Sequence, residues 1–144
     1  DPKDISARLL LAQYLEAQGD LALALEQYDA ILTIDASNAP ALAQSGRILY
    51  LTAGAGPAVD AAGLVEKSQL RLDAALLADP EYSEARFFRA IVRANEFADF
   101  SGAQGDLQRY LVTEPNGRFA AQARQLLTDV TNALSSPSSS GGGG

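Results

Sequence analysis

The chain has 144 residues, of which 47% are hydrophobic, so it holds enough apolar material for one domain with a continuous core. It contains no histidine and no cysteine, which excludes the commonest general base, thiol nucleophiles and nearly every zinc site built from nitrogen or sulfur ligands. Eleven basic and eighteen acidic residues give a net charge of −7, which argues against a nucleic-acid partner and favours a basic or neutral protein partner.

The first predicted element is a helical hairpin over residues 5–34. Small and apolar residues recur at the spacing of one helical face up to residue 18. This stripe comprises Ala7, Leu11, Ala12 and Leu15. Gly19 favours a left-handed helix end, and Asp20 is expected to accept hydrogen bonds from the free N–H groups of the next helix. A second apolar stripe over 21–32 predicts that next helix, which ends before the polar run 35–38.

The pattern returns after 34 residues, which predicts a second hairpin over 39–82. Its first stripe comprises Ala41, Ser45, Gly46 and Leu49, and its second comprises Val65, Ser68, Leu72, Ala75 and Leu76. The second stripe arrives about ten residues late. The excess lies at 53–60, where the run Ala53-Gly54-Ala55-Gly56-Pro57 is rich in helix breakers and predicts a protruding loop insertion.

A third hairpin is predicted over 83–117, where Ser101 and Gln104 have the spacing of a capping box at the start of its second helix. The segment 118–134 is amphipathic and predicts a helix that covers the apolar face of the last hairpin. The Ser/Pro/Gly segment 135–144 has nothing apolar to bury and predicts a disordered tail.

Nothing in the chain predicts a direct contact with a membrane. No stretch approaches the roughly 20 apolar residues that a membrane-spanning helix needs, and the start at residues 1–4 is not a signal peptide. Because the sequence does not begin with methionine, we expect that a signal or a membrane anchor could precede residue 1.

These repeats resemble those of the tetratricopeptide repeat (TPR) family, and the resemblance covers residues 1 to 134. The first repeat matches the family's packing positions best, with Ala7, Leu11, Ala12, Leu15, Gly19, Asp20, Ala24, Tyr28, Ile31 and Leu32. The resemblance implies an all-α, right-handed solenoid of three hairpins, at about 5–38, 39–82 and 83–117, with a C-terminal capping helix at 118–134. Ser45, Arg89 and Arg93 depart from the usual apolar residues, so we expect looser packing or rotated helices there.

The resemblance also implies a binding site, because the first helices of TPR hairpins line a concave groove. The groove positions carried over to this chain are Leu9, Gln13, Glu16, Ala43, Arg47, Tyr50, Glu84, Phe87, Ile91 and Asn95. This mixture of apolar, aromatic and hydrogen-bonding side chains suits an amphipathic helix or an extended peptide with apolar anchors. The alternative is that an aromatic such as Phe87 or Phe88 packs in the core.

Two more specific kinds of site are not expected. The TPR domains that clamp the terminal carboxylate of chaperone tails use lysine and asparagine, whereas the equivalent positions here are Leu9, Gln13, Gln44, Glu84 and Phe88. The acidic residues Asp79, Glu81 and Glu84 match no ion-binding loop, and the helix dipole favours them without a ligand. We therefore expect neither a carboxylate clamp nor a metal or other cofactor.

The composition and one short segment of the sequence indicate one expected function, and one alternative stands beside it. The alanine and leucine content and the phrase Ala85-Arg86-Phe87-Phe88-Arg89-Ala90 are similar to bacterial TPR proteins of cytochrome c biogenesis. That resemblance implies a scaffold for a client polypeptide on the extracytoplasmic side of a membrane. The alternative is a structural module that associates with itself and binds no peptide. We expect no enzymatic activity and no catalytic residue, because no nucleophile and base are placed together.

Overall fold

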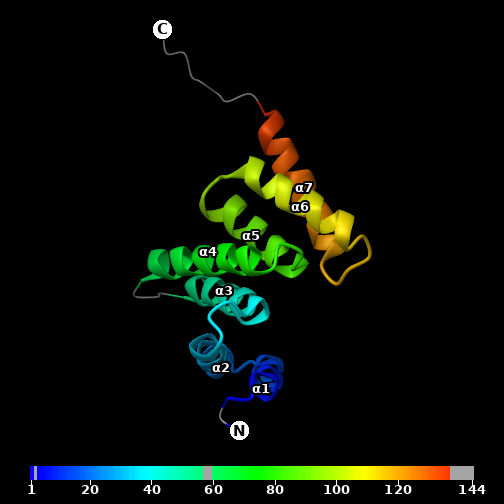
Figure 1. Ribbon diagram of the computed structural model, residues 1–144. Coiled ribbons are helices and arrows are strands. Elements are labelled where there is room, and N and C mark those ends of the chain that lie inside the picture. Colours follow the sequence, from blue (N-terminus) through cyan, green and yellow to red (C-terminus); the bar gives the residue numbers. More distant parts are fainter. Residues whose placement is uncertain (2, 57–59, 137–144) are drawn as a thin grey trace.

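The structure is a computed structural model in which residues 1, 3–56 and 60–136 are described. Over these residues the chain forms seven helices and no strand, which stack from the first hairpin to the last helix (Figure 1). The helices are α1 (Ile5–Gln18), α2 (Leu21–Ile34), α3 (Ala39–Gly54), α4 (Ala61–Ala78), α5 (Ser83–Glu96), α6 (Phe100–Thr113) and α7 (Ala120–Ser135). The predicted all-α solenoid of three hairpins with a capping helix is confirmed.

Each hairpin packs against the next, and α7 packs on α6 as the predicted cap (Figure 1). Most of the predicted disordered tail, residues 137–144, lies outside the described residues. Its first residue, Ser135, is instead the last residue of α7, and its hydroxyl donates to the carbonyl of Thr131 at 2.9 Å.

The ends of the helices follow local side-chain chemistry, with two corrections to the sequence analysis. Gly19 ends α1 at φ +85°, the left-handed conformation that glycine adopts without steric cost. Asp20 precedes α2, but its side chain makes no capping hydrogen bond. The predicted capping box of Ser101 and Gln104 is also wrong. Instead Asp99 caps α6 by accepting from the Gly102 N–H at 2.9 Å, because the helix begins earlier, at Phe100.

The insertion in the second hairpin is shorter than the sequence suggested. Ala53 and Gly54 belong to α3, so the helix continues into the run that was expected to break it. Residues 57–59 of the predicted loop lie outside the described residues. The remaining extra residues lengthen the two helices: α3 has 16 residues and α4 has 18, against 14 in each helix of the first and third hairpins.

The core lies between the helices of each pair and between successive pairs. The small residues Ala12, Gly46 and Ala90 are all buried where paired helices approach. At Gly46 the approach is close enough for the Ser68 hydroxyl on α4 to donate to the backbone carbonyl of Gly46 at 2.7 Å. Small side chains at these positions therefore set the distance between the two helices of a hairpin.

A charged cluster replaces apolar packing where α4, α5 and α6 meet. Asp106 of α6 is 4% exposed and accepts two hydrogen bonds from Arg89 of α5, at 2.7 and 2.8 Å. Arg93 donates to the same carboxylate at 3.0 Å, and Arg86 lies 3.9 Å from it. Arg89 also donates to Asp73 of α4 at 2.9 Å. The arginines that depart from the usual repeat pattern are thus held by carboxylates rather than loosely packed.

These carboxylates also set the protonation of Arg89. Burial lowers its pKa, but the hydrogen bonds and charges of Asp106 and Asp73 outweigh burial, so the pKa is raised overall. Arg89 is therefore a fixed positive charge that bridges two neighbouring hairpins.

At the N-terminal end of the stack, α1 carries exposed apolar side chains. Leu10, Leu11 and Tyr14 are 68%, 44% and 62% exposed. Thirty-four residues later, Ile48 occupies the position of Tyr14 and is fully buried within the cluster that includes residues of α2. Ser45, at the position of Leu11, is also fully buried, whereas Gln44, at the position of Leu10, is half-buried. The positions of Leu11 and Tyr14 are therefore covered in the second hairpin and uncovered in the first.

No helix in the described part of the chain is both long and apolar enough to cross a bilayer.

Candidate binding groove

The principal hollow, hereafter the groove, opens on the side of the stack that α1, α3 and α5 share. It measures about 650 Å³. Its lining residues are Gln13, Glu16, Ala17, Leu21, Tyr28, Gln44, Arg47, Tyr82, Glu84, Phe88, Arg118 and Phe119. The first helices of all three hairpins therefore contribute side chains to one surface, which is the arrangement that the resemblance to TPR domains implied.

A row of hydrogen bonds joins the three hairpins along the floor of the groove. The Tyr28 hydroxyl donates to Glu16 at 2.5 Å, and Glu16 forms an ion pair with Arg47 of α3. The Arg47 Nε donates to the side-chain oxygen of Gln44 at 3.0 Å, and the Gln44 amide donates to Glu84 of α5 at 2.7 Å. Because each member is held by its neighbours, the row presents a pre-organised polar surface to a ligand.

Arg47 occupies the centre of this row. Its guanidinium lies 5.7 Å from the centroid of the Phe88 ring, so the cation also contacts an aromatic face of α5. Burial lowers the pKa of Arg47, and the nearby positive charge of Arg118 lowers it further. Arginine nevertheless stays protonated in proteins, so Arg47 supplies a positive charge between the carboxylates of Glu16 and Glu84.

Tyr28 contributes a neutral donor to the same row. Its side chain is 1% exposed, and burial raises its pKa to about 12, helped by the nearby Tyr82 and Glu84. The phenol therefore keeps its proton at any physiological pH and fixes one oxygen of Glu16.

An aromatic cluster closes the end of the groove nearest α7. Phe119, which precedes α7, stacks on Phe87 with ring centroids 4.7 Å apart and meets Phe88 edge-on at 5.3 Å. The neighbouring Arg118 lies over the Phe119 ring at 5.0 Å. The capping segment therefore both covers the last hairpin and forms one wall of the groove.

The sequence-predicted site residues divide into two groups. Seven lie in or beside the groove and its continuation along α3 and α5: Gln13, Glu16, Arg47, Tyr50, Glu84, Ile91 and Asn95. Leu9, Ala43 and Phe87 point inward instead. Leu9 packs on the core of the first hairpin, Ala43 is fully buried, and Phe87 is 5% exposed beneath Phe119. We therefore leave these three out of the proposed contact surface.

Sequence reasoning did not assign several lining residues to the groove. Tyr28 lies on the second helix α2, Tyr82 is the residue just before α5, and Arg118 and Phe119 precede the capping helix α7. Positions within first helices therefore do not include them. Phe88 was noted only as a clamp position or a core aromatic, and it serves both core and groove at 5% exposure. A signal was available for Phe119, because a large aromatic just before the cap helix has to pack on the last hairpin.

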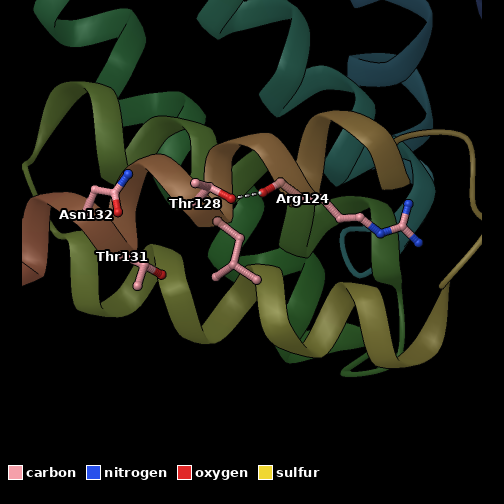
Figure 2. A pocket seen from close by; sticks show the side chains of 5 residues that line it. Arg124, Thr128, Thr131 and Asn132 are labelled. Carbon is pink, nitrogen blue, oxygen red and sulfur yellow. Dashed lines mark hydrogen bonds between the residues drawn. The ribbon is translucent and has the colours of Figure 1, made fainter.

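A separate hollow on α7 has little to offer a ligand. Figure 2 shows its lining side chains, which all come from this one helix: Arg124, Leu127, Thr128, Thr131 and Asn132. The Thr128 hydroxyl donates to the carbonyl of Arg124 at 3.1 Å, so it serves its own helix (Figure 2). The side-chain amide of Gln104 on α6 donates to the Thr131 hydroxyl at 3.1 Å, so this group is engaged as well, and we treat the hollow as a surface depression.

The described residues also contain no group of three or more acidic side chains placed to hold a metal ion. The groove therefore offers hydrogen bonds, charges and aromatic faces for binding. Its described residues contain no cluster arranged for metal chemistry.

Comparison with models of known protein families gives no match, and comparison with curated proteins gives none either. Solved structures with the same fold do exist. The first TPR domain of Spaghetti (RPAP3), bound to the HSP90 peptide SRMEEVD, superposes with a TM-score of 0.75 and 18% identity, over 94% of this chain and 97% of that one.

Two further solved structures are similar over comparable lengths. The Sgt2 TPR domain from Aspergillus fumigatus has a TM-score of 0.69 and 20% identity, over 91% of this chain and 79% of that one. The Yersinia enterocolitica type III secretion chaperone SycD, in complex with a peptide of the translocator YopD, has a TM-score of 0.69 and 13% identity, over 90% and 93%. The chain therefore has the fold of a TPR domain.

Proposed function

We propose that this TPR-fold chain is a scaffold that binds a peptide segment of another protein in the groove. The supporting observation is that α1, α3 and α5 together line one hollow with fixed charges, amides and an aromatic face. Similar structures carry HSP90 and YopD peptides, which fits this use of the fold. The finer assignment to cytochrome c maturation, outside the bacterial cytoplasm, stays a prediction from the sequence resemblance.

The charged side chains in the groove argue against a receptor for chaperone tails. The peptide in the Spaghetti structure, SRMEEVD, is acidic. In this chain Glu16 and Glu84 flank Arg47 in the groove, and Arg47 is already paired with Glu16. A terminal carboxylate would therefore meet two like charges, and the cations of the groove, Arg47 and Arg118, do not reproduce a clamp of lysine and asparagine.

Selection of random twelve-residue peptides displayed on phage, followed by titration of the best synthetic peptide into ¹⁵N-labelled protein, tests this function. We expect amide shifts at Gln13, Glu16, Arg47 and Glu84. We also expect Arg47→Ala to weaken binding by about tenfold or more, as truncation of a central arginine commonly does. Its matched control is Arg71→Ala, because the Arg71 side chain is equally exposed, at 26%, and also forms an ion pair, with Asp29.

Either of two results would contradict peptide binding in the groove. If the shifts lie on outward faces of α2, α4 and α6, or if Arg71→Ala weakens binding as much as Arg47→Ala, the peptide does not occupy the groove.

The exposed face of α1 favours one second candidate, a module that associates with itself. Leu10 and Tyr14 are more than half exposed there, whereas Ile48, the equivalent of Tyr14 in the second hairpin, is fully buried. A second copy of the chain could cover this face in the way that α2 covers α3. Because burial of apolar side chains drives such contacts, sedimentation velocity should show concentration-dependent dimers.

A double variant distinguishes this association from other contacts. Leu10→Glu with Tyr14→Glu should abolish the dimers, whereas Leu77→Glu should not, although Leu77 on α4 is 86% exposed. A single monomeric species for the wild type at every concentration would remove the second candidate.

A further inference from the structure

A small apolar cavity opens beside the groove, between α3 and α5. Its volume is about 130 Å³. We call it the anchor cavity. It is lined by Arg47, Tyr50, Leu51, Leu72, Phe88, Ile91 and Val92. Leu72 of α4 and Val92 of α5 are buried at 0% and 1% exposure, so they form its floor, whereas Leu51 is 43% exposed at its rim. The anchor cavity is thus lined mainly by apolar side chains, whereas the neighbouring groove has a polar floor.

The size of the anchor cavity matches one large apolar side chain. A cavity of about 150 Å³ lined by apolar side chains admits a benzene-sized guest. Its polar neighbours are already engaged. The Tyr50 hydroxyl donates to Glu96 at 3.0 Å and accepts from Asn95 at 3.3 Å. Nothing in the cavity requires a polar guest, so a leucine, isoleucine or phenylalanine side chain fits its chemistry.

An acidic hollow follows immediately along α3. It is lined by Tyr50, Ala53, Gly54, Ala61, Ala62, Val65, Glu66, Glu96 and Phe97. These residues include two carboxylates and no lysine or arginine. No ion pair joins either Glu66 or Glu96 to a cation within the described residues. A positive charge placed there would be attracted by both carboxylates.

The three hollows form one path. The groove and the anchor cavity share Arg47 and Phe88, and the anchor cavity and the acidic hollow share Tyr50. From Arg47 to Gly54 the axis of α3 advances by about 10 Å, at 1.5 Å per residue. An extended peptide covers that distance in about three residues. The path therefore separates an apolar side chain from a positive one by two or three residues.

We propose that the preferred ligand is a peptide with one large apolar side chain in the anchor cavity and a lysine or arginine two or three residues away, over Glu66 and Glu96. This inference rests on the proposed peptide-binding function and specifies the partner's chemistry. The net charge of −7 agrees with a basic segment, because long-range attraction adds to the local contacts. It also predicts that the acidic peptide SRMEEVD is a poor ligand for this chain.

Sequencing the selected phage peptides gives the first test. We expect enrichment of a large apolar residue with a basic residue two or three positions away. In the best synthetic peptide, serine in place of the apolar residue should weaken binding by roughly 10- to 100-fold, as loss of one buried apolar side chain implies. Glutamate in place of the basic residue should weaken it by roughly tenfold at low salt, and by less as salt screens the charges.

Protein variants locate each contact. Leu51→Trp enlarges a side chain at the rim of the anchor cavity and should weaken peptide binding by roughly tenfold. Leu70→Trp is its control, since Leu70 is 69% exposed on α4 and lies outside the cavity. The double variant Glu66→Gln with Glu96→Gln should remove most of the preference for the basic residue. Its control, Glu26→Gln, removes an exposed carboxylate of α2 that lines none of these hollows.

The possible results separate this inference from the proposed function. If peptides bind, lose affinity with Arg47→Ala, but show neither an apolar anchor nor a basic preference, the inference fails and groove binding stands. If no selected peptide depends on Arg47, the proposed function fails first. The peptide substitutions need no change in the protein, so they decide the inference even where a variant folds poorly.

Discussion

Replacing Asp106 with alanine should lower the free energy of unfolding by about 3 kcal/mol, the largest stability effect that we expect from a single substitution in this chain. The carboxylate of Asp106 is 4% exposed and accepts hydrogen bonds from Arg89 and Arg93. Removing it leaves these guanidinium groups in a partly buried site without their main counter-charge. We expect the low end of the range for buried pairs, because Arg89 keeps Asp73.

Urea unfolding followed by circular dichroism measures this effect. The matched control is Asp29→Ala, which removes the partner of Arg71 at 2.7 Å, a pair whose carboxylate side is 49% exposed. Surface pairs of this kind contribute about 0 to 1 kcal/mol. If Asp106→Ala cost no more than Asp29→Ala, the cluster would not stabilise the packing of α6 on α5.

A compensating variant separates the cost of unpaired charge from the loss of contacts. In the first repeat Leu11 and Leu15 occupy the positions of Arg89 and Arg93. The variant in which Arg89, Arg93 and Asp106 are all changed to leucine should therefore have a free energy of unfolding at least about 2 kcal/mol higher than that of Asp106→Ala. The reason is that apolar replacements of buried ion clusters are often neutral or stabilising. A triple variant as unstable as the single one would show that the arginine stems, rather than their charges, support the packing.

The contrast between these repeats shows why the fold was predictable from the sequence and this cluster was not. Helix positions and the 34-residue offset follow from apolar spacing, because a buried stripe has to recur with the helical period. Arg89 and Arg93 break that stripe, and the sequence alone suggested looser packing. Their partner Asp106 lies on the buried stripe of α6, between Ala103 and Leu107, and only the folded pairing brings it to α5.

The groove shows a similar limit. The family's groove positions selected Glu16, Arg47 and Glu84, and the structure places all three in the lining of the groove, because first helices share one side of the stack. They also selected Ala43 and Phe87, which the stacking of Phe119 and the close approach of neighbouring helices bury. These positions predict which helix faces a hollow. The rotation of that helix depends on side-chain volumes in other repeats, which no local pattern contains.

The second large effect is expected at Gly46, where leucine should lower the free energy of unfolding by roughly 1 to 3 kcal/mol through overpacking. A β-carbon at Gly46 would lie 3.0 Å from Cγ of Leu72 and 3.3 Å from the backbone carbonyl oxygen of Ser68. The Leu72 side chain is fully buried and cannot move aside freely. Larger atoms would also force α3 from α4 and break the hydrogen bond from the Ser68 hydroxyl to the Gly46 carbonyl.

The control for this prediction is a second glycine in a helix. Gly105 lies in α6, and a β-carbon there would meet nothing within 4 Å. Because leucine is the better helix former by up to about 1 kcal/mol, Gly105→Leu should be neutral or stabilising in the same thermal melts. Opposite signs for the two substitutions would locate the effect in the contact between α3 and α4. A melt of Gly46→Leu unchanged from the wild type would mean that α3 and α4 do not pair at this point, and the anchor cavity, whose floor includes Leu72, would lose its support.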